Sequence, residues 1–210
     1  DFVNSISKEQ IAKTQYCSIE KAGRCVAGNK GLSLATGDYF VFLDDDDLFY
    51  ADHIEVLVQA IAKYKVKAAY ANAFEVQTEV KSLQPLEYVE HNYAVLHRQP
   101  FSRLTMWHHN YIPIQCILFS RELYDEMGGF DLSLDNLEDW NLWTRYSVKN
   151  DFKYIEKTTS IYRVPMPGPV SQERQKMLDW YYQKAKKKQD DMLLTLSVTE
   201  LSKLIDQTAA

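Results

Sequence analysis

Apolar residues follow two different periods along the chain, which predicts strands that alternate with helices. The uninterrupted run of residues 39–43 is typical of a strand covered on both faces. A helix is predicted to start at Asp52, with Glu55 three residues later as a capping partner. Its apolar stripe consists of Ile54, Leu57, Val58 and Ile61.

The rest of the pattern extends this alternation. Strands are predicted over 14–19, 68–76, 112–119, 152–156 and 159–164, and a hairpin or long loop over 77–97. Helices are predicted over 98–107, from Ser120 to the Gly128-Gly129 pair, from 137 with Asn136 as N-cap, and over 171–192 and 199–207. Such alternation favours an α/β fold with a mixed, mostly parallel sheet flanked by helices. Residues 165–169 break regular structure, so we expect one domain over 1–165 and a helical C-terminal extension over 166–210.

Composition narrows the class of protein. The 210 residues are 46% hydrophobic and 25% charged, as in soluble globular proteins, and their net charge of -5 argues against a nucleic-acid partner. The chain holds three widely spaced cysteines with no CxxC pair, which we interpret as reduced thiols in a cytoplasmic protein. No run approaches the roughly 18 apolar residues that span a bilayer.

Four consecutive aspartates, Asp44 to Asp47, follow the strand predicted over 39–43. Ligands in open α/β sheets bind outside the carboxyl ends of the strands. Oxygen-rich sites suit Mg²⁺ and Mn²⁺, which bind one or two carboxylates together with substrate phosphates. The pattern therefore indicates a metal-diphosphate site, with a solvated acidic turn or a metal-dependent phosphohydrolase as alternatives.

The segment Glu138-Asp139-Trp140 is a second carboxylate site. Asp139 lies three residues after the predicted N-cap, so it could satisfy free backbone N–H groups at the helix start. It could also be a general base that takes a proton from an attacking hydroxyl. The pattern alone leaves both interpretations open.

Several motifs together resemble family 2 of the glycosyltransferases, which are inverting enzymes with the GT-A fold. The stretches 23–31, 35–39 and 42–47 are similar to the family's Gly/Asn-rich helix start, its A-x-G-x-Y segment and its Asp-x-Asp motif. The stretch 128–131, then 138–140 with Arg145, is similar to the acceptor-side signature, and Tyr162-Arg163 to the closing Y-R pair. The resemblance covers roughly residues 20 to 165, and the order and spacing of the motifs make it specific.

The resemblance implies a role for each matched residue. Asp46 and Asp44 would hold Mn²⁺ or Mg²⁺, and Asp139 would be the catalytic base. The residues implied to contact substrates are Asp44, Asp45, Asn29, Gly31, Arg24, Glu138 and Trp140. Their partners would be a nucleotide-sugar donor, a UDP-sugar in the first place, and a saccharide or lipid-linked saccharide acceptor. The implied activity is metal-dependent sugar transfer with inversion, in bacterial cell-surface polysaccharide synthesis.

One departure keeps a further alternative open. The family begins with a strand–helix–strand unit that holds the nucleotide base, and the residues before position 20 are too few to form it. We therefore expect this chain to lack the front of its nucleotide-binding half. A non-catalytic sugar-binding or assembly module derived from such an enzyme is the alternative function.

Aromatic and basic residues near the C-terminus suggest a further contact. The run 180–188 joins a tryptophan and two tyrosines to four lysines, a combination that suits an anionic membrane surface as well as a solvated helix face. It predicts a peripheral location at the inner face of the cell membrane. The tryptophans Trp107, Trp140 and Trp143 could stack on sugar rings or pack in the core.

Overall fold

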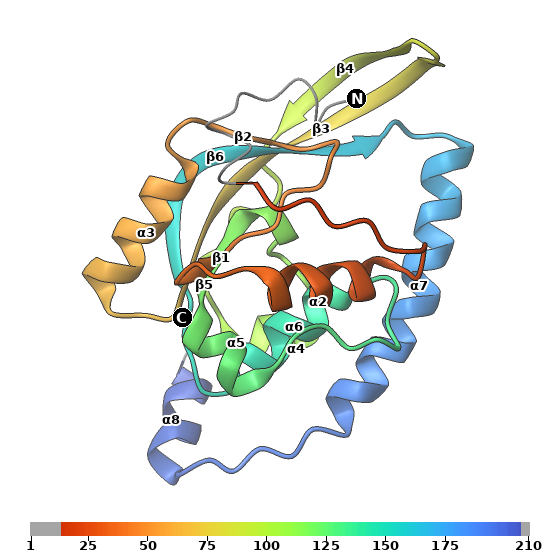
Figure 1. Cartoon of the computed structure of the whole chain (residues 1–210). Coiled ribbons are helices and arrows are strands. Elements are labelled where there is room, and N and C mark those ends of the chain that lie inside the picture. The colour runs from red at the N-terminus through yellow and green to blue at the C-terminus, as the bar shows by residue number, and fades with distance from the viewer. Residues whose placement is uncertain (1–13, 207–210) are drawn as a thin grey trace.

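A single six-stranded sheet with helices on both faces forms the centre of the computed structural model, which describes residues 14–206 (Figure 1). The strands are β1 (Tyr39–Phe40), β2 (Leu48–Phe49), β3 (Ala68–Leu83), β4 (Leu86–Ala94), β5 (Ile117–Ser120) and β6 (Lys153–Pro165). The helices are α2 (Arg24–Leu34), α3 (His53–Tyr64), α4 (Arg103–His108), η2 (Ile114–Cys116), α5 (Arg121–Met127), α6 (Glu138–Tyr146), α7 (Pro169–Asp190) and α8 (Val198–Asp206).

The sheet is mixed, with the strand order β1-β5-β3-β6-β2 and with β4 paired to β3. Only the β3–β6 pair is parallel among the described strands; the other pairs are antiparallel. The predicted α/β class with a mixed sheet is confirmed, whereas a mostly parallel sheet is wrong for the described residues. An apolar run reports burial on both faces, but it carries no information about the direction of its neighbour.

Strand β3 forms the centre of the core because its small residues allow close packing on both faces. Ala69 and Ala71 pack with Leu57 and Ile61 of α3. Tyr70, whose side chain points to the opposite face, belongs to the larger cluster that includes α2, α5 and α6. Alternate residues of a strand point to opposite faces, so one strand serves both layers. The apolar stripe predicted for α3 is thus confirmed at Leu57 and Ile61, with Val58 partly buried beside them, whereas Ile54 is exposed.

Helix starts were predicted with mixed success. The Ser120 hydroxyl accepts a hydrogen bond from the backbone N–H of Leu123, and α5 ends where Gly128 adopts a φ of 74°, as predicted. Asn136 is not the N-cap of α6: that position is Leu137, with a left-handed φ of 58°. The Asn136 amide instead donates to the Met177 sulfur of α7. Long-range contact with α7 thus replaces the local capping bond.

The predicted and observed strands differ most at their ends. Residues 14–19 have no regular structure, and the 39–43 run forms a strand only at Tyr39–Phe40 before it turns into the acidic loop. Residues 114–116 form the short η2 turn ahead of β5. The segments 152–156 and 159–164 join into one strand, β6, whose pairing with β3 shifts between Ile155 and Thr158. The polar stretch after 77 is a hairpin arm of β3 and β4.

Helix α7 packs against α6 and β6, along the right-hand side of Figure 1. The Tyr182 ring stacks on Trp140 with 5.2 Å between centroids, and Gln189 donates a hydrogen bond of 2.9 Å to Thr144. The predicted boundary after residue 165 falls at the end of β6, and the division into two domains stays a prediction. Helix α8 matches the predicted last helix, whose expected end at Gln207 lies outside the described residues.

Within residues 14–206, every helix is too short or too polar to cross a bilayer.

Candidate active site

One cleft of about 550 Å³ contains both carboxylate groups that the sequence singled out. The loop between β1 and β2 supplies Asp44 to Asp47, and the start of α6 supplies Glu138 and Asp139. The remaining wall includes Arg24, Asn110, Tyr162, Arg163 and Arg174. Two acidic sites that lie about 90 residues apart in the chain therefore share one solvent-filled space.

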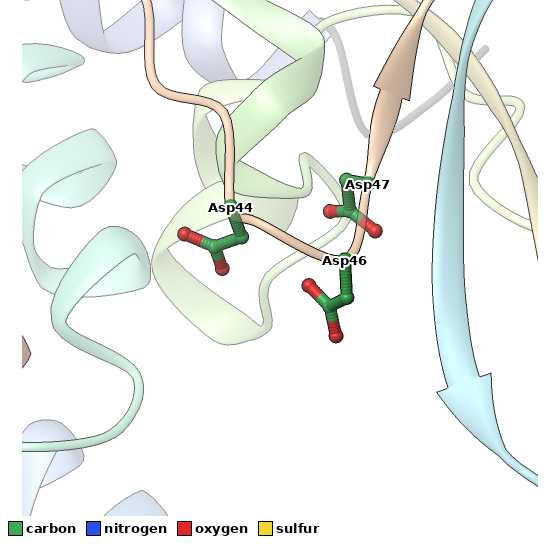
Figure 2. A group of neighbouring side chains, drawn as sticks. All are labelled: Asp44, Asp46 and Asp47. Carbon is green, nitrogen blue, oxygen red and sulfur yellow. The ribbon is translucent and has the colours of Figure 1, made fainter. Parts of the chain in front are cut away.

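Three of the four aspartates form a compact group on the acidic loop (Figure 2). One carboxylate oxygen from each of Asp44, Asp46 and Asp47 lies within 4.8 Å of the other two. A turn brings them together, since the Asp47 N–H donates to the Asp44 carbonyl over 3.2 Å. An all-oxygen group of this kind fits a hard divalent cation such as Mg²⁺ or Mn²⁺.

Asp47 was not assigned a role from the sequence, yet it is the buried member of the group. It is 6% exposed, and its carboxylate accepts a hydrogen bond of 2.8 Å from the Arg163 N–H. Burial raises the pKa of Asp47 to about 7, and the negative charges of Asp46 and Asp44 add to this effect. Its position just before β2 directs the side chain inward, whereas Asp45 is exposed.

Arg163 ties the acidic loop to the rest of the sheet. Its guanidinium donates to the Asp46 carbonyl and forms an ion pair with Glu90 of β4 at 2.6 Å. The same residue supplies the backbone N–H that Asp47 accepts. The Y-R pair therefore fixes the loop by side-chain and backbone contacts.

Asp139 lies part-buried at the start of α6, with one hydrogen bond to each carboxylate oxygen. Its Oδ2 accepts from the Asn110 side-chain amide over 2.8 Å, and its Oδ1 accepts from the Trp140 N–H over 2.7 Å. Burial raises the pKa of Asp139, against the opposing effect of these two donors. The orientation of the carboxylate is thus fixed while its affinity for a proton is increased.

Asn110 is a second residue of the site, and its contact with Asp139 was not predicted from the sequence. The side-chain oxygen of Asn110, Oδ1, accepts a hydrogen bond of 3.1 Å from the Ile112 N–H. This bond fixes the side-chain amide so that its nitrogen faces Asp139. The contact joins residues 29 positions apart, and no local pattern marks it.

Glu138 and Arg24 connect the two acidic groups. The Arg24 guanidinium lies 3.1 Å from the Glu138 carboxylate, whose side chain is 6% exposed. Burial and the neighbouring Asp139 raise the pKa of Glu138 to about 7, and Arg24 opposes them. Burial lowers the pKa of Arg24, but Glu138, Asp44 and Asp139 together raise it above its usual value. Arg24 therefore interacts electrostatically with the carboxylates of both sites.

Three predicted substrate-binding residues lie away from the cleft. Trp140 is 1% exposed and donates from Nε1 to the Met106 carbonyl, so it packs in the core. Gly31 lies further along α2, beside a separate hollow. Asn29 clamps the loop after α5, because its amide exchanges two hydrogen bonds with the Phe130 backbone. The substrate contacts of these three residues stay predictions.

The glycine-rich start of α2 has a packing reason. A Cβ on Gly28 would lie 2.6 Å from the Phe130 ring, and one on Gly129 would lie 2.1 Å from the Asn29 oxygen. Only glycine permits this close approach between α2 and the loop after α5. The approach holds Arg24, at the first turn of α2, beside Glu138.

Comparisons with known proteins agree with this geometry. Residues 3–128 match the model of glycosyl transferase family 2. The uncharacterized glycosyltransferase YwdF of Bacillus subtilis is 27% identical over 148 residues, which cover 69% of this chain and 52% of YwdF. WcaA of Escherichia coli, whose name describes a colanic acid biosynthesis glycosyl transferase, is 26% identical over 145 residues, or 68% of this chain and 49% of WcaA.

The fold has solved counterparts. The mannosyltransferase PcManGT from Pyrobaculum calidifontis, solved with GDP-Man and Mn²⁺, superposes with a TM-score of 0.57 at 18% identity, over 90% of this chain and 49% of that one. TarS of S. aureus with UDP-GlcNAc gives a TM-score of 0.50 at 12% identity, over 71% of this chain and 41% of TarS. The expected GT-A fold is confirmed.

The family match decides against the phosphohydrolase interpretation of the acidic loop. The chain spans about half the length of the curated relatives YwdF and WcaA. The matched stretch includes α2 and the acidic loop and ends at Gly128, before the segment with Glu138 and Asp139. With more than half of its residues matched, the chain belongs to glycosyl transferase family 2.

Proposed function

We propose that this protein transfers a sugar from a nucleotide-diphosphate sugar to an acceptor hydroxyl, with inversion at the anomeric carbon and with help from a divalent cation. The observation that carries the proposal is the shared cleft, which contains the compact Asp44–Asp46–Asp47 group and the hydrogen-bonded Asp139. Each group alone has a structural explanation. A single displacement needs the leaving group on one side of the reacting carbon and the nucleophile on the other. The shared cleft brings together one carboxylate site for each side.

The leaving-group side is the acidic loop. Asp46 and Asp44, with the buried Asp47 as a third ligand, would hold Mn²⁺ or Mg²⁺. Such a cation, when bound, supplies positive charge that stabilises the diphosphate as it departs. Asp45 lines the same cleft and would contact the donor beside this group. Arg163 keeps the loop in this conformation through its contact with the Asp46 carbonyl.

The nucleophile side is the start of α6. Asp139 would accept the proton of the acceptor hydroxyl as that oxygen bonds to the anomeric carbon. Its raised pKa makes it a stronger base than an exposed aspartate, provided that it is ionised. Asn110 and the Trp140 N–H hold its two oxygens, so one lone pair on each remains for the acceptor. One displacement opposite the leaving group inverts the configuration.

Glu138 and Arg24 complete the acceptor side. The second carboxylate oxygen of Glu138 is buried and lacks a hydrogen-bond partner within the described part of the chain. A buried acceptor atom of this kind is costly unless a ligand satisfies it. We infer that an acceptor hydroxyl donates to it, while Arg24 holds the other oxygen.

The related proteins support the choice of donor and pathway. GDP-Man is bound by PcManGT and UDP-GlcNAc by TarS, so UDP- and GDP-sugars are the first donors to test. The name of WcaA supports a role in the synthesis of a surface polysaccharide with a saccharide or lipid-linked acceptor.

We place the protein in the cytoplasm, where its two buried cysteines, Cys25 and Cys116, and the exposed Cys17 would stay reduced.

Membrane contact through residues 180–188 stays a prediction. Trp180 is 61% exposed on α7, as an interfacial anchor would be. Lys184, Lys186 and Lys188 all have protein partners, namely the Ser133 carbonyl, Asp190 and Asp131. Flotation with anionic vesicles tests the contact, and protein that stays at the bottom of the gradient would contradict it.

The direct test is a donor screen with the 210-residue chain and Mn²⁺. UDP- and GDP-sugars are incubated with oligosaccharide acceptors, and the anomeric configuration of any product is read by NMR. We expect metal-dependent transfer with inversion from one nucleotide class. Donor binding without transfer to any acceptor would favour the non-catalytic module, and retention of configuration would exclude the proposed role of Asp139.

A further inference from the structure

Arg174 is the one arginine of the cleft that α7 supplies, and it lies outside the residues that match the family model. We propose that Arg174 binds a phosphate group of a substrate in this cleft, and that the C-terminal helix thereby forms part of the substrate site. The inference rests on the proposed function, because it needs a phosphate-bearing substrate there.

The charges of the cleft single out Arg174. Arg24 forms an ion pair with Glu138 at 3.1 Å, and Arg163 forms one with Glu90 at 2.6 Å. Within residues 14–206, Arg174 has no carboxylate partner; its guanidinium donates instead to the neutral Tyr162 hydroxyl. Carboxylates thus offset the positive charges of Arg24 and Arg163. In the described part of the chain, the charge of Arg174 has no such partner and is available to a ligand.

The surroundings of Arg174 place this charge close to the reacting groups. Its guanidinium carbon lies 5.8 Å from the centre of the Tyr162 ring, which supports the half-buried side chain. Tyr162 lines the same cleft as Asp139 and Asp47, whose negative charges add to burial in raising the pKa of its hydroxyl. Leu178, one turn further along α7, lines the same cleft. A substrate that reaches both carboxylate groups therefore passes within reach of Arg174.

Electrostatics indicate an anion as the partner. The cleft wall contains six carboxyl groups, from Asp44 to Asp47 and from Glu138 and Asp139, which would repel a phosphate unless a cation offset them. An arginine presents a planar fork of donors that matches phosphate oxygens and can bind two of them at once. The phosphate could belong to the donor diphosphate or to a phosphorylated acceptor, since both offer the same chemistry.

Calorimetry with two probes separates these sources. The donor probe is UDP or GDP with Mn²⁺, and the acceptor probe is octyl phosphate added to protein saturated with that nucleotide. Arg174→Ala removes the fork, Arg174→Lys keeps only the charge, and Lys176→Ala removes one exposed charge from the same helix as a control. Circular dichroism and melting temperature confirm that each variant folds.

We expect Arg174→Ala to weaken one of the two probes by about tenfold or more, with Arg174→Lys in between and Lys176→Ala like wild type. A loss confined to the nucleotide assigns the donor diphosphate, and a loss confined to octyl phosphate assigns an acceptor phosphate. Unchanged affinity for both probes would overturn the inference and leave the proposed function intact. Wild-type protein that binds neither nucleotide with Mn²⁺ would overturn the two together.

Discussion

The side-chain amide of Asn110 donates a hydrogen bond of 2.8 Å to Oδ2 of Asp139. This contact fixes a carboxylate that also accepts from the N–H of its neighbour Trp140. Asn110 touches Asp139 and acts through it, so it is a positioning residue for the proposed base.

Asn110→Ala should lower kcat about 10- to 100-fold with a smaller change in donor KM, because a misplaced base loses part of the contribution of proton transfer. The Asn110 donor also lowers the pKa of Asp139, so its removal should move the acidic limb of the pH–rate profile to higher pH. A merely structural role would reduce the rate without moving that limb. An unmoved limb with normal kcat would contradict the positioning role.

Glu138→Gln tests the coupling between the two neighbouring acids. The change keeps the size of the side chain, removes one negative charge next to Asp139 and frees Arg24 to face it. Both effects favour ionised Asp139, so its pKa falls. The acidic limb of the pH–rate profile should move to lower pH, while the plateau rate falls because the base is weaker. A limb at unchanged pH would show that Glu138 and Asp139 titrate independently.

Asp46→Ala should abolish the dependence of donor binding on Mn²⁺, because it removes one ligand of the compact acidic group. Titration calorimetry of UDP and GDP with and without Mn²⁺ measures this. Asp45→Ala is the matched comparison, since Asp45 lies on the same loop outside the compact group and should weaken binding less. Equal Mn²⁺ dependence in wild type and Asp46→Ala would exclude the metal role of Asp46.

Much of this arrangement was accessible from the sequence. Helix α3 follows from its apolar stripe and α5 from Ser120 and Gly128, because these signals are local. The sequence also singled out both acidic segments, which the structure brings into one cleft.

What escaped prediction depends on contacts between distant segments. Asn110 reaches Asp139 across 29 residues, and the burial of Asp47 depends on β6, more than 100 residues away. Trp140, whose contact with the acceptor stays a prediction, packs in the core against Tyr182 of α7, and no local pattern in the sequence indicates that packing. Sequence patterns identify which residue types carry chemistry, whereas packing decides which of them face the cleft.

Asp47 should make the metal-free protein less stable as pH rises. Its pKa in the folded chain is about 7 against an ordinary value of 3.8, so between these values the folded state binds more protons than the unfolded state. Stability contributed by protonated Asp47 is therefore present below about pH 4 and is lost as pH rises through about 7.

Asp47→Asn imitates the protonated form and should raise the free energy of unfolding at pH 7, in EDTA, by about 1–3 kcal/mol. Urea unfolding at pH 5 and pH 7 measures the difference, and the exposed Asp45→Asn serves as the control. A destabilised Asp47→Asn protein at pH 7 would contradict the raised pKa.

The central claim is that Asp139 takes the proton of the acceptor while the acidic loop holds the donor. The most direct measurement compares sugar transfer and Mn²⁺-dependent donor binding in one preparation of Asp139→Asn, with Asp179→Asn on the exposed face of α7 as control. We expect transfer to fall by about 10²- to 10⁴-fold, while the donor Kd stays within about twofold of wild type. Near-normal transfer by Asp139→Asn, or loss of donor binding together with transfer, would contradict it.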